Sequence, residues 1–279
     1  MRGGGIIAGG HAILTGGSSG IGLAAAKLLA ARGMHVSLLA RDSSRLAAAQ
    51  EEVERERRDR AQRVATFPVD VAEREAIEGA IARALGEVGP PNLLIACAGF
   101  SRPGRFLEIP PEDFERLVAV NYLGSVYAVR AVLPAMRKVG RGRIVLISSG
   151  AGLIGIFGYS SYSPTKFALR GFAEALRAEI KPWGIGVSIV YPPDTETPGF
   201  REEERTKPAE TRRIGETARR LSPEAVARAI VEGIDRERFA IAPGWEMALL
   251  HRTANPFRAV ISWYLDRLAA GASSPREKP

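Results

Sequence analysis

A glycine-rich run at residues 15–22, TGGSSGIG, constrains the fold of this chain more than any other stretch. It follows a short apolar run at residues 12–14, which predicts a strand, and it precedes a helical pattern at residues 23–31. Glycine lets a backbone approach a pyrophosphate closely, and a helix N-terminus offers free N–H groups to an anion. Such a turn also occurs without a ligand, so the strand–turn–helix context carries the interpretation. We expect a dinucleotide-binding unit here.

Apolar runs and helical patterns alternate along the rest of the chain. Further strands are predicted at residues 36–39, 64–69, 92–96, 143–147, 186–191 and 238–242, and helices at residues 43–62, 72–85, 110–137 and 222–235, with another after residue 162. This alternation predicts an α/β protein, a Rossmann-type doubly wound parallel sheet of about seven strands with helices on both faces. No repeat or linker divides the chain, so we expect a single domain.

Composition argues against several other classes of protein. The single cysteine, Cys97, excludes an internal disulfide framework and suits a reducing, cytoplasmic compartment. Three scattered histidines give no zinc-like spacing, so we expect no metal site. The net charge is +8, but much of the excess lies at residues 54–63, where acids interleave with arginines as on a solvated helix. We therefore expect no nucleic-acid partner. The uncharged stretches 3–26 and 144–165 are too rich in Gly and Ser to span a membrane.

The end of the predicted second strand bears on the choice of nucleotide. In a dinucleotide-binding unit an acid at this place binds the ribose 2′-OH, whereas an arginine pairs with a 2′-phosphate. Arg41 comes first and Arg45 lies one helical turn further on, which favours NADP over NAD. Asp42 lies between them, and a cap on the following helix would also explain it.

A second polar group follows the predicted fifth strand. Tyr162 and Lys166 are four residues apart and share one face of a helix. A nearby ammonium should lower the pKa of the phenol, so that it exchanges protons with an alcohol or ketone. Ser149 ends the strand and could bind the same oxygen, and Asn121 lies inside a helix, where asparagine is unfavourable. Alone, a Tyr-x-x-x-Lys pair is more often a packed aromatic beside a solvated charge.

The stretch after the predicted sixth strand leaves the regular pattern. Residues 192–199 are rich in proline, and dense charge continues to Arg220. Because ligands of open α/β sheets bind where strands end, we interpret residues 194–220 as a substrate lid.

These motifs together resemble the short-chain dehydrogenase/reductase family over residues 12–242. The resemblance implies that Tyr162 donates a proton, Ser149 (or its neighbour Ser148) orients the substrate carbonyl, Lys166 holds the nicotinamide ribose, and Asn121 maintains a water relay to the lysine. It implies NADP(H) as cofactor, bound by Gly16, Ser18, Ser19, Gly20, Ile21, Gly22, Arg41, Arg45, Asp70, Val71, Ala98, Gly99, Tyr162, Lys166, Pro192 and Thr197. Residues 1–245 would form the NADP-binding reductase domain, lid included, and residues 246–279 a helical extension with a frayed tail.

A narrower resemblance rests on the run YPPDTETPGF at residues 191–200 and on the stretches around Arg41 and Tyr159. It is similar to the 3-ketodihydrosphingosine reductase branch, which implies a long-chain keto-lipid substrate reduced with NADPH. Two alternatives remain open at this point. One is reduction of another lipid-like ketone, such as a steroid or a 3-oxoacyl substrate, and the other is a non-catalytic nucleotide sensor.

The C-terminal part of the chain allows two interpretations. Residues 257–269 contain three charged side chains and cannot span a bilayer, but Trp263 and Tyr264 would suit a helix lying on a membrane surface. The alternative is that this helix packs on the sheet or on a second subunit. The family resemblance implies a homodimer or homotetramer. We expect a cytoplasmic protein, with peripheral contact at the cytoplasmic membrane face if this helix binds lipid.

Overall fold

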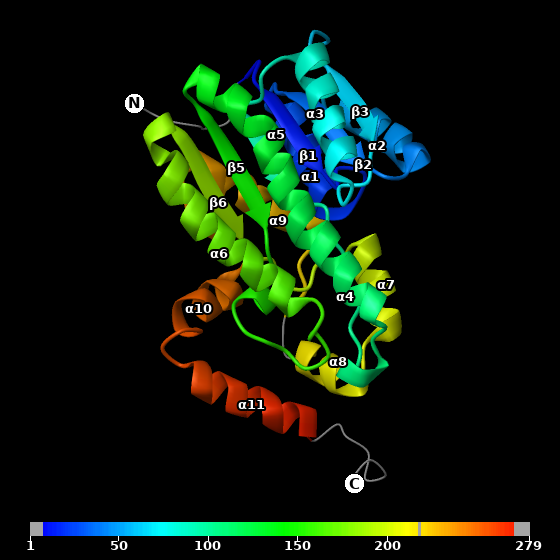
Figure 1. Ribbon diagram of the computed structural model, residues 1–279, viewed down its shortest axis with the longest axis vertical. Helices are drawn as coiled ribbons and strands as arrows, with labels where there is room; N and C mark the ends of the chain where they lie inside the picture. The colour runs from blue at the N-terminus through cyan, green and yellow to red at the C-terminus, as the bar shows by residue number, and fades with distance from the viewer. Residues whose placement is uncertain (1–7, 217–218, 271–279) are drawn as a thin grey trace.

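A parallel sheet of seven strands forms the centre of the computed structural model, which describes residues 8–216 and 219–270 (Figure 1). The strands are β1 (His11–Thr15), β2 (His35–Ala40), β3 (Val64–Pro68), β4 (Leu93–Ala96), β5 (Gly142–Ile147), β6 (Ile185–Val190) and β7 (Ala240–Ile241). Their order in space is β3-β2-β1-β4-β5-β6-β7. The order reverses between β1 and β4, where open α/β sheets bind ligands. The predicted fold is confirmed, and each expected strand boundary agrees within two residues.

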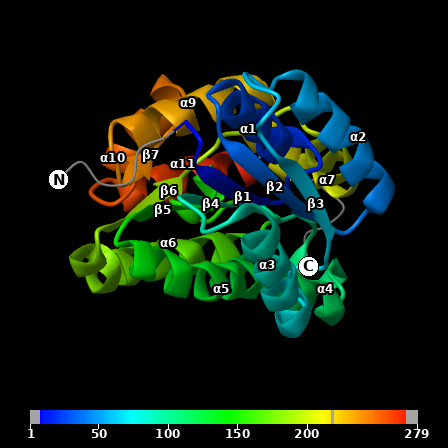
Figure 2. The ribbon, with the colours of Figure 1, turned by 90° about the horizontal axis from the view of Figure 1, so that it is seen from above.

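Helices cover both faces of the sheet, as the view from above shows (Figure 2). One face carries α1 (Gly20–Ala31), α2 (Ser43–Arg55) and α9 (Pro223–Asp235), and the other carries α3 (Arg74–Val88), α5 (Gly124–Val139) and α6 (Ser163–Ile180). Two apolar cores result, one on each side of the strands. Every residue of β1, β4 and β5 is buried, which is why these strands read as continuous apolar runs.

The helix that leads to α5 is long and apolar. It comprises α4 (Pro111–Leu117), a π-helical turn η2 (Val118–Leu123) and α5 without a break. The combined helix, Pro111–Val139, meets the length and hydropathy of a membrane span, with 44% of its most apolar window buried. Its apolar side lies in the core, where Val129, Val132 and Met136 are almost fully buried. Core packing therefore accounts for its hydropathy.

The second helix ends earlier than the sequence predicts, at Arg55 rather than at residue 62. Gln62 is buried, and its amide donates to the carbonyl oxygens of Ala30 (2.7 Å) and Met34 (2.8 Å). Its own side-chain oxygen accepts from the Asp59 amide at 2.7 Å. These bonds fix residues 56–63 as a turn that closes the end of α1, so helical pattern alone misplaced the boundary.

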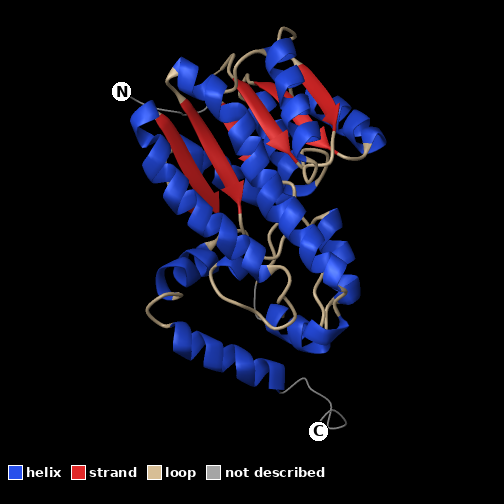
Figure 3. Cartoon of the chain, viewed as in Figure 1, coloured by secondary structure: helices blue, strands red, loops and turns tan. Residues whose placement is uncertain are grey.

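Further helices lie beyond the carboxyl ends of the strands, in the direction of the strand arrows (Figure 3). They are α7 (Pro198–Thr206), α8 (Ala209–Gly215), α10 (Trp245–Thr253) and α11 (Arg258–Ala270). A bridge between Thr195 and Leu221 closes the base of this excursion. We call residues 194–216 the α7–α8 segment.

The C-terminal helix α11 packs against α8. Packing on the sheet is thus not what the structure shows, because α10 lies between α11 and the strands (Figure 1), whereas contact with a second subunit or with a membrane surface stays a prediction. The expected frayed tail falls mostly on residues 271–279, outside the described residues.

Candidate active site

Tyr162, Lys166 and Ser149 meet at the carboxyl end of β5. Tyr162 precedes the first turn of α6, which accommodates Pro164, so Lys166 follows one turn later on the same face. The Lys166 ammonium donates to the carbonyl oxygen of Ile147 at 3.0 Å and lies 5.5 Å from the centre of the Tyr162 ring. Ser149 is the second residue after the strand, and its side chain lies close enough to the Tyr162 phenol to lower the pKa of that phenol, although burial raises it overall. The structure thus brings these three predicted residues together.

Ser148, the alternative to Ser149, has a different role. The residue is 3% exposed, and its hydroxyl donates to the main-chain carbonyl of Lys166 at 2.9 Å. This bond attaches the end of β5 to α6. Ser148 therefore positions the lysine, and Ser149 is the serine beside the tyrosine.

Asn121 belongs to the same group of side chains. It lies in the π-helical turn η2, where its amide donates to the oxygens of Phe100 (2.9 Å) and Thr165 (3.2 Å) and its carbonyl accepts from the Phe100 amide (3.0 Å). A Cβ atom at Gly99 would lie 3.1 Å from Asn121 Oδ1 and 3.4 Å from Lys166 Nζ. Asn121 and Lys166 thus face one space beside Gly99. A π turn, common at functional sites, allows an asparagine in this helix.

The electrostatics of Tyr162 contradict the sequence-based expectation. Burial raises its pKa above the ordinary value of a phenol, and the charges of Glu203 and Asp194 raise it further, whereas the hydrogen bond with Ser149 lowers it. Burial also lowers the pKa of Lys166 to about 8, because its ammonium is desolvated. The expected lowering of the tyrosine pKa was therefore wrong, because burial and the two carboxylates raise it.

The α7–α8 segment supplies neighbours that sequence reasoning did not assign. The Tyr159 hydroxyl donates to the Glu203 carboxylate, and the Tyr159 ring lies 5.6 Å from the Tyr162 ring between centroids. Lys207 pairs with Glu203 at 2.9 Å. In the sequence only the dense charge of this stretch marked these side chains, because their place depends on how α7 packs.

The glycine-rich turn after β1 is closely packed. A Cβ at Gly16, which has φ of +67°, would lie 2.8 Å from the backbone of Ala98, and one at Gly22 would lie 2.3 Å from the Gly16 carbonyl. Gly20 has φ of +54°, and its Cβ would lie 2.8 Å from a methyl group of Thr197. The turn, the end of β4 and the α7–α8 segment therefore converge, with the close backbone approach that a dinucleotide requires. Ser19 precedes α1, and its side chain makes no capping bond to the first-turn amides of that helix.

The charged residues after β2 and β3 lie beside one another. Asp42 caps α2 by accepting from the Arg45 amide at 3.0 Å, which settles its role as a cap. Arg45 approaches the same carboxylate at 3.5 Å, with both side chains exposed. Desolvation raises the pKa of Asp70, but the Ala72 amide and the ion pair with Arg116 hold it below its usual value, and the nearby charge of Arg41 adds to this lowering. Two arginines thus flank the end of β2.

The remaining predicted cofactor residues also lie at this edge. Ile21 packs against the apolar core under α1, and the Val71 side chain fills the space beside Gly124. The Pro192 carbonyl accepts from the Gly150 amide at 3.0 Å, which joins the ends of β5 and β6. All the predicted residues are therefore close to the carboxyl ends of the strands.

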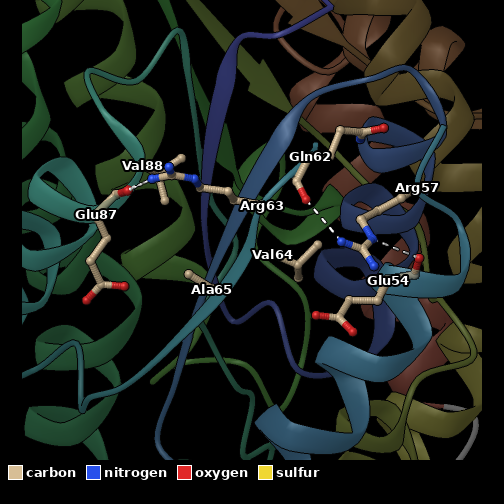
Figure 4. Close-up of a pocket in the computed structure, with 8 residues that line it drawn as sticks. All are labelled: Glu54, Arg57, Gln62, Arg63, Val64, Ala65, Glu87 and Val88. Carbon is tan, nitrogen blue, oxygen red and sulfur yellow. Dashed lines mark hydrogen bonds between the residues drawn. The ribbon is translucent and has the colours of Figure 1, made fainter. Parts of the chain in front are cut away.

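A shallow groove at the opposite edge of the sheet is not this site (Figure 4). It is lined by Glu54, Arg57, Gln62, Arg63, Val64, Ala65, Glu87 and Val88, around the start of β3. Its two arginines are bound to main-chain carbonyls, Arg57 to Gln62 at 3.1 Å and Arg63 to Glu87.

In residues 8–216 and 219–270, no group of His, Cys, Asp and Glu side chains is arranged to hold a metal ion.

Comparison with known proteins decides the family. Residues 10–208 match the short chain dehydrogenase family. This chain belongs to that family. It is 46% identical to a 3-dehydrosphinganine reductase of Danio rerio, over 85% of this chain and 71% of the relative. It is 46% identical to a 3-ketodihydrosphingosine reductase of Bos taurus (80% and 68% covered) and 38% identical to one of Dictyostelium discoideum (83% and 74%).

Solved structures agree on the fold. A short chain dehydrogenase/reductase from Burkholderia phymatum in complex with NAD has a TM-score of 0.80 at 24% identity, covering 91% of this chain and 95% of that one. A short-chain dehydrogenase from Streptomyces avermitilis has a TM-score of 0.77 at 28% identity, covering 95% and 99%. The protein is thus an oxidoreductase of this family with a nucleotide cofactor.

Proposed function

We propose that this protein reduces the ketone of 3-ketodihydrosphingosine to dihydrosphingosine with NADPH, a step of sphingolipid biosynthesis. The main support is the similarity to 3-dehydrosphinganine reductases, at 46% identity over 85% of this chain in one case. The intact group of Asn121, Ser149, Tyr162 and Lys166 favours a catalyst over a nucleotide sensor without turnover.

The side chains around Tyr162 fit carbonyl reduction. When bound, a reduced nicotinamide supplies a hydride to the carbonyl carbon. Tyr162 gives its phenolic proton to the carbonyl oxygen, which takes up the electron pair of the C=O π bond, and Ser149 holds that oxygen by a hydrogen bond. Lys166 and Asn121 then return a proton from solvent to the phenolate. The tight turn of Gly16 and Gly22 fits the nucleotide, since larger residues would fill the space of the backbone approach.

Arg41 and Arg45 support NADPH rather than NADH. A charged hydrogen bond contributes about 1.5–3 kcal/mol, so Arg41→Ala should raise the KM for NADPH roughly tenfold to hundredfold and leave the KM for NADH unchanged. Arg55→Ala is the matched control, because Arg55 lies at the other end of α2 in an exposed pair with Glu51. Equal effects on both cofactors would refute the assignment of the 2′-phosphate site.

The α7–α8 segment and the C-terminal helices fit a lipid substrate. We infer that the segment acts as the substrate lid, and that residues 246–270 belong to the same domain, since Met247 packs beside Gly150 and α11 packs on α8. Leu249, Phe257, Val260, Trp263 and Tyr264 are exposed on α10, on α11 and between them. Exposed aromatic and aliphatic side chains support peripheral contact with the cytoplasmic membrane face, from which a lipid could enter. From the family we also infer a homodimer or homotetramer.

The direct test is NADPH oxidation with 3-ketodihydrosphingosine presented in mixed micelles. We expect turnover, with steroid ketones and 3-oxoacyl thioesters reduced far more slowly. Preference for one of these other ketones would replace the proposed substrate and keep the enzyme class. Nucleotide binding without turnover of any ketone would favour the sensor.

A further inference from the structure

Two carboxylates of the α7–α8 segment belong to the cluster around Tyr159, the ring that packs on the tyrosine proposed to donate the proton. Glu203 accepts a hydrogen bond from Tyr159, whose ring packs on Tyr162. Asp194 follows β6 and is joined to the same cluster through Lys207, at 3.5 Å. The side chain of Glu203 is 13% exposed and that of Asp194 is 29% exposed. Both therefore lie inside the fold and at the edge of the site.

The cations of this cluster do not balance its anions. Lys207 is the shared cation of three carboxylates, those of Asp194, Glu203 and Glu204, and approaches Glu204 most closely, at 2.6 Å. Its ammonium also lies 4.3 Å from the centre of the Phe200 ring. Arg220 stacks on that ring at 5.0 Å from an exposed position. Three carboxylates thus share one buried lysine in this cluster, and the charges of Glu203 and Asp194 act on Tyr162, while burial raises the pKa of Glu203 itself.

The negative charge of these carboxylates makes the reduction of a neutral ketone less favourable. The carbonyl oxygen becomes negative as the hydride arrives, and nearby carboxylates destabilise such an oxygen. They also raise the pKa of Tyr162, which weakens it as a proton donor. A substrate that brings a positive charge close to its carbonyl would cancel both effects.

We propose that Glu203, with Asp194, binds the protonated amine of the substrate and so determines specificity for an α-amino ketone. The inference rests on the proposed function, since 3-ketodihydrosphingosine carries its amine on the carbon next to the ketone. The ammonium nitrogen is two bonds away from the carbonyl carbon. When Tyr162 binds the carbonyl oxygen, the ammonium lies on the side of the site where the two carboxylates are. A charged hydrogen bond to Glu203 orients the carbonyl, and the ammonium offsets the negative field at its oxygen.

The test compares two substrates of equal chain length, 3-ketodihydrosphingosine and its analogue with hydrogen in place of the amine. Glu203→Gln should lower kcat/KM for the amine substrate roughly tenfold to hundredfold and leave it unchanged or raised for the neutral analogue. Asp194→Asn should act in the same direction with a smaller effect. Glu202→Gln is the matched control, because Glu202 is exposed and paired with Arg205 at 2.8 Å, and it should alter neither substrate.

The outcomes separate this inference from the proposed function. An equal loss on both substrates in Glu203→Gln and in Asp194→Asn would assign the carboxylates to holding the segment in place and overturn the inference. If the wild type reduces the amine substrate and neither substitution changes kcat/KM, the inference about Glu203 and Asp194 is overturned. The proposed function then remains intact. Reduction of the neutral analogue alone by the wild type would refute both. Melting temperature and NADPH affinity should stay at wild-type values in Asp194→Asn, which keeps the test decisive if Glu203→Gln folds poorly.

Discussion

Both edges of the parallel sheet hold buried polar side chains, but they use them differently. At the amino edge, His11 is 2% exposed, and its ring nitrogens lie 2.8 Å from the Gly89 carbonyl and 2.8 Å from the Ser37 hydroxyl. Arg143 donates to Ser188 at 3.0 Å, and Ser188 donates to the Arg238 carbonyl at 2.7 Å. Polar groups at this edge are satisfied by strands and turns of the fold itself.

At the carboxyl edge the buried polar groups surround a space instead. Asn121 and Lys166 face the same position beside Gly99, and the charges of Glu203 and Asp194 raise the pKa of the buried Tyr162. Glycines keep the neighbouring backbone close, as at Gly16. The comparison teaches that burial of a polar side chain does not mark a site by itself. Shared orientation toward a space kept open by small residues does.

The largest expected effect is on kcat, which a substitution at the carboxyl edge should lower and one at the amino edge should not. Tyr162→Phe should lower kcat about 10²- to 10⁴-fold, because the proton donor is lost, and leave NADPH affinity unchanged. His11→Asn should keep kcat and lower the melting temperature. Steady-state kinetics and nucleotide titration of both variants check this contrast. A large loss of kcat in the His11 variant would contradict the division between the edges.

Glycine substitutions test the role of the backbone in nucleotide binding at the carboxyl edge. Gly16→Val should weaken nucleotide binding about 100-fold or more, because its Cβ would collide with Ala98 and its φ of +67° disfavours a branched residue. Gly86→Ala is the matched control in α3, with no atom within 4 Å of its Cβ. It should stabilise the fold by about 0.5–1 kcal/mol without altering binding. Fluorescence titration with NADPH and thermal melts give both readouts, and tight nucleotide binding by Gly16→Val would disprove the role of the turn.

A smaller effect concerns the charges of the α7–α8 segment. Lys207→Met leaves three carboxylates without their shared cation and should lower the free energy of unfolding by about 3–5 kcal/mol or detach the segment. Lys27→Met, which breaks an exposed pair with Glu52, should cost about 0–1 kcal/mol. Denaturant unfolding and limited proteolysis measure the difference. Equal costs in the two variants would show that the buried cation is not needed.

The smallest effect is a pH dependence of stability from the amino edge. Burial lowers the pKa of His11 from 6.5 to about 4, so the folded state favours the neutral ring. As the pH falls from 6.5 toward 4, the unfolded state binds this proton first, and the free energy of unfolding should fall by roughly 3 kcal/mol. Above pH 6.5 this contribution is fully present. The His11→Asn variant should lose stability at neutral pH and show a flatter profile from 6.5 to 4, and an unchanged profile would contradict the assignment.

The parts of the site that sequence predicts are those encoded by local spacing. The glycines of the first turn and the four-residue spacing of Tyr162 and Lys166 specify their geometry within one turn of chain. Glu203 could not be found this way, because its place beside Tyr162 depends on how a helix far along the chain packs. The raised pKa of Tyr162 has the same origin, since its burial and the carboxylates of the α7–α8 segment are properties of the assembled fold.

The fold follows the same rule. Continuous apolar runs predict the buried strands, because both faces of a parallel sheet are covered. The end of α2 was missed because Gln62 turns inward to satisfy carbonyl groups of α1 and of the turn before β2. The π turn at Asn121 was missed because its residues read as ordinary helix, with only the unfavourable asparagine as a signal. The packing of α11 on α8 likewise joins segments distant in sequence.

The most direct test of the central claim follows the hydride. NADPH carrying deuterium at the transferable positions of its nicotinamide would be incubated with 3-ketodihydrosphingosine and the wild type or Tyr162→Phe. By mass spectrometry we expect dihydrosphingosine with one deuterium on the new carbinol carbon from the wild type, and about 10²- to 10⁴-fold less of it from the variant. Equal amounts of labelled product from both proteins, or none from a wild type that binds NADPH, would contradict it.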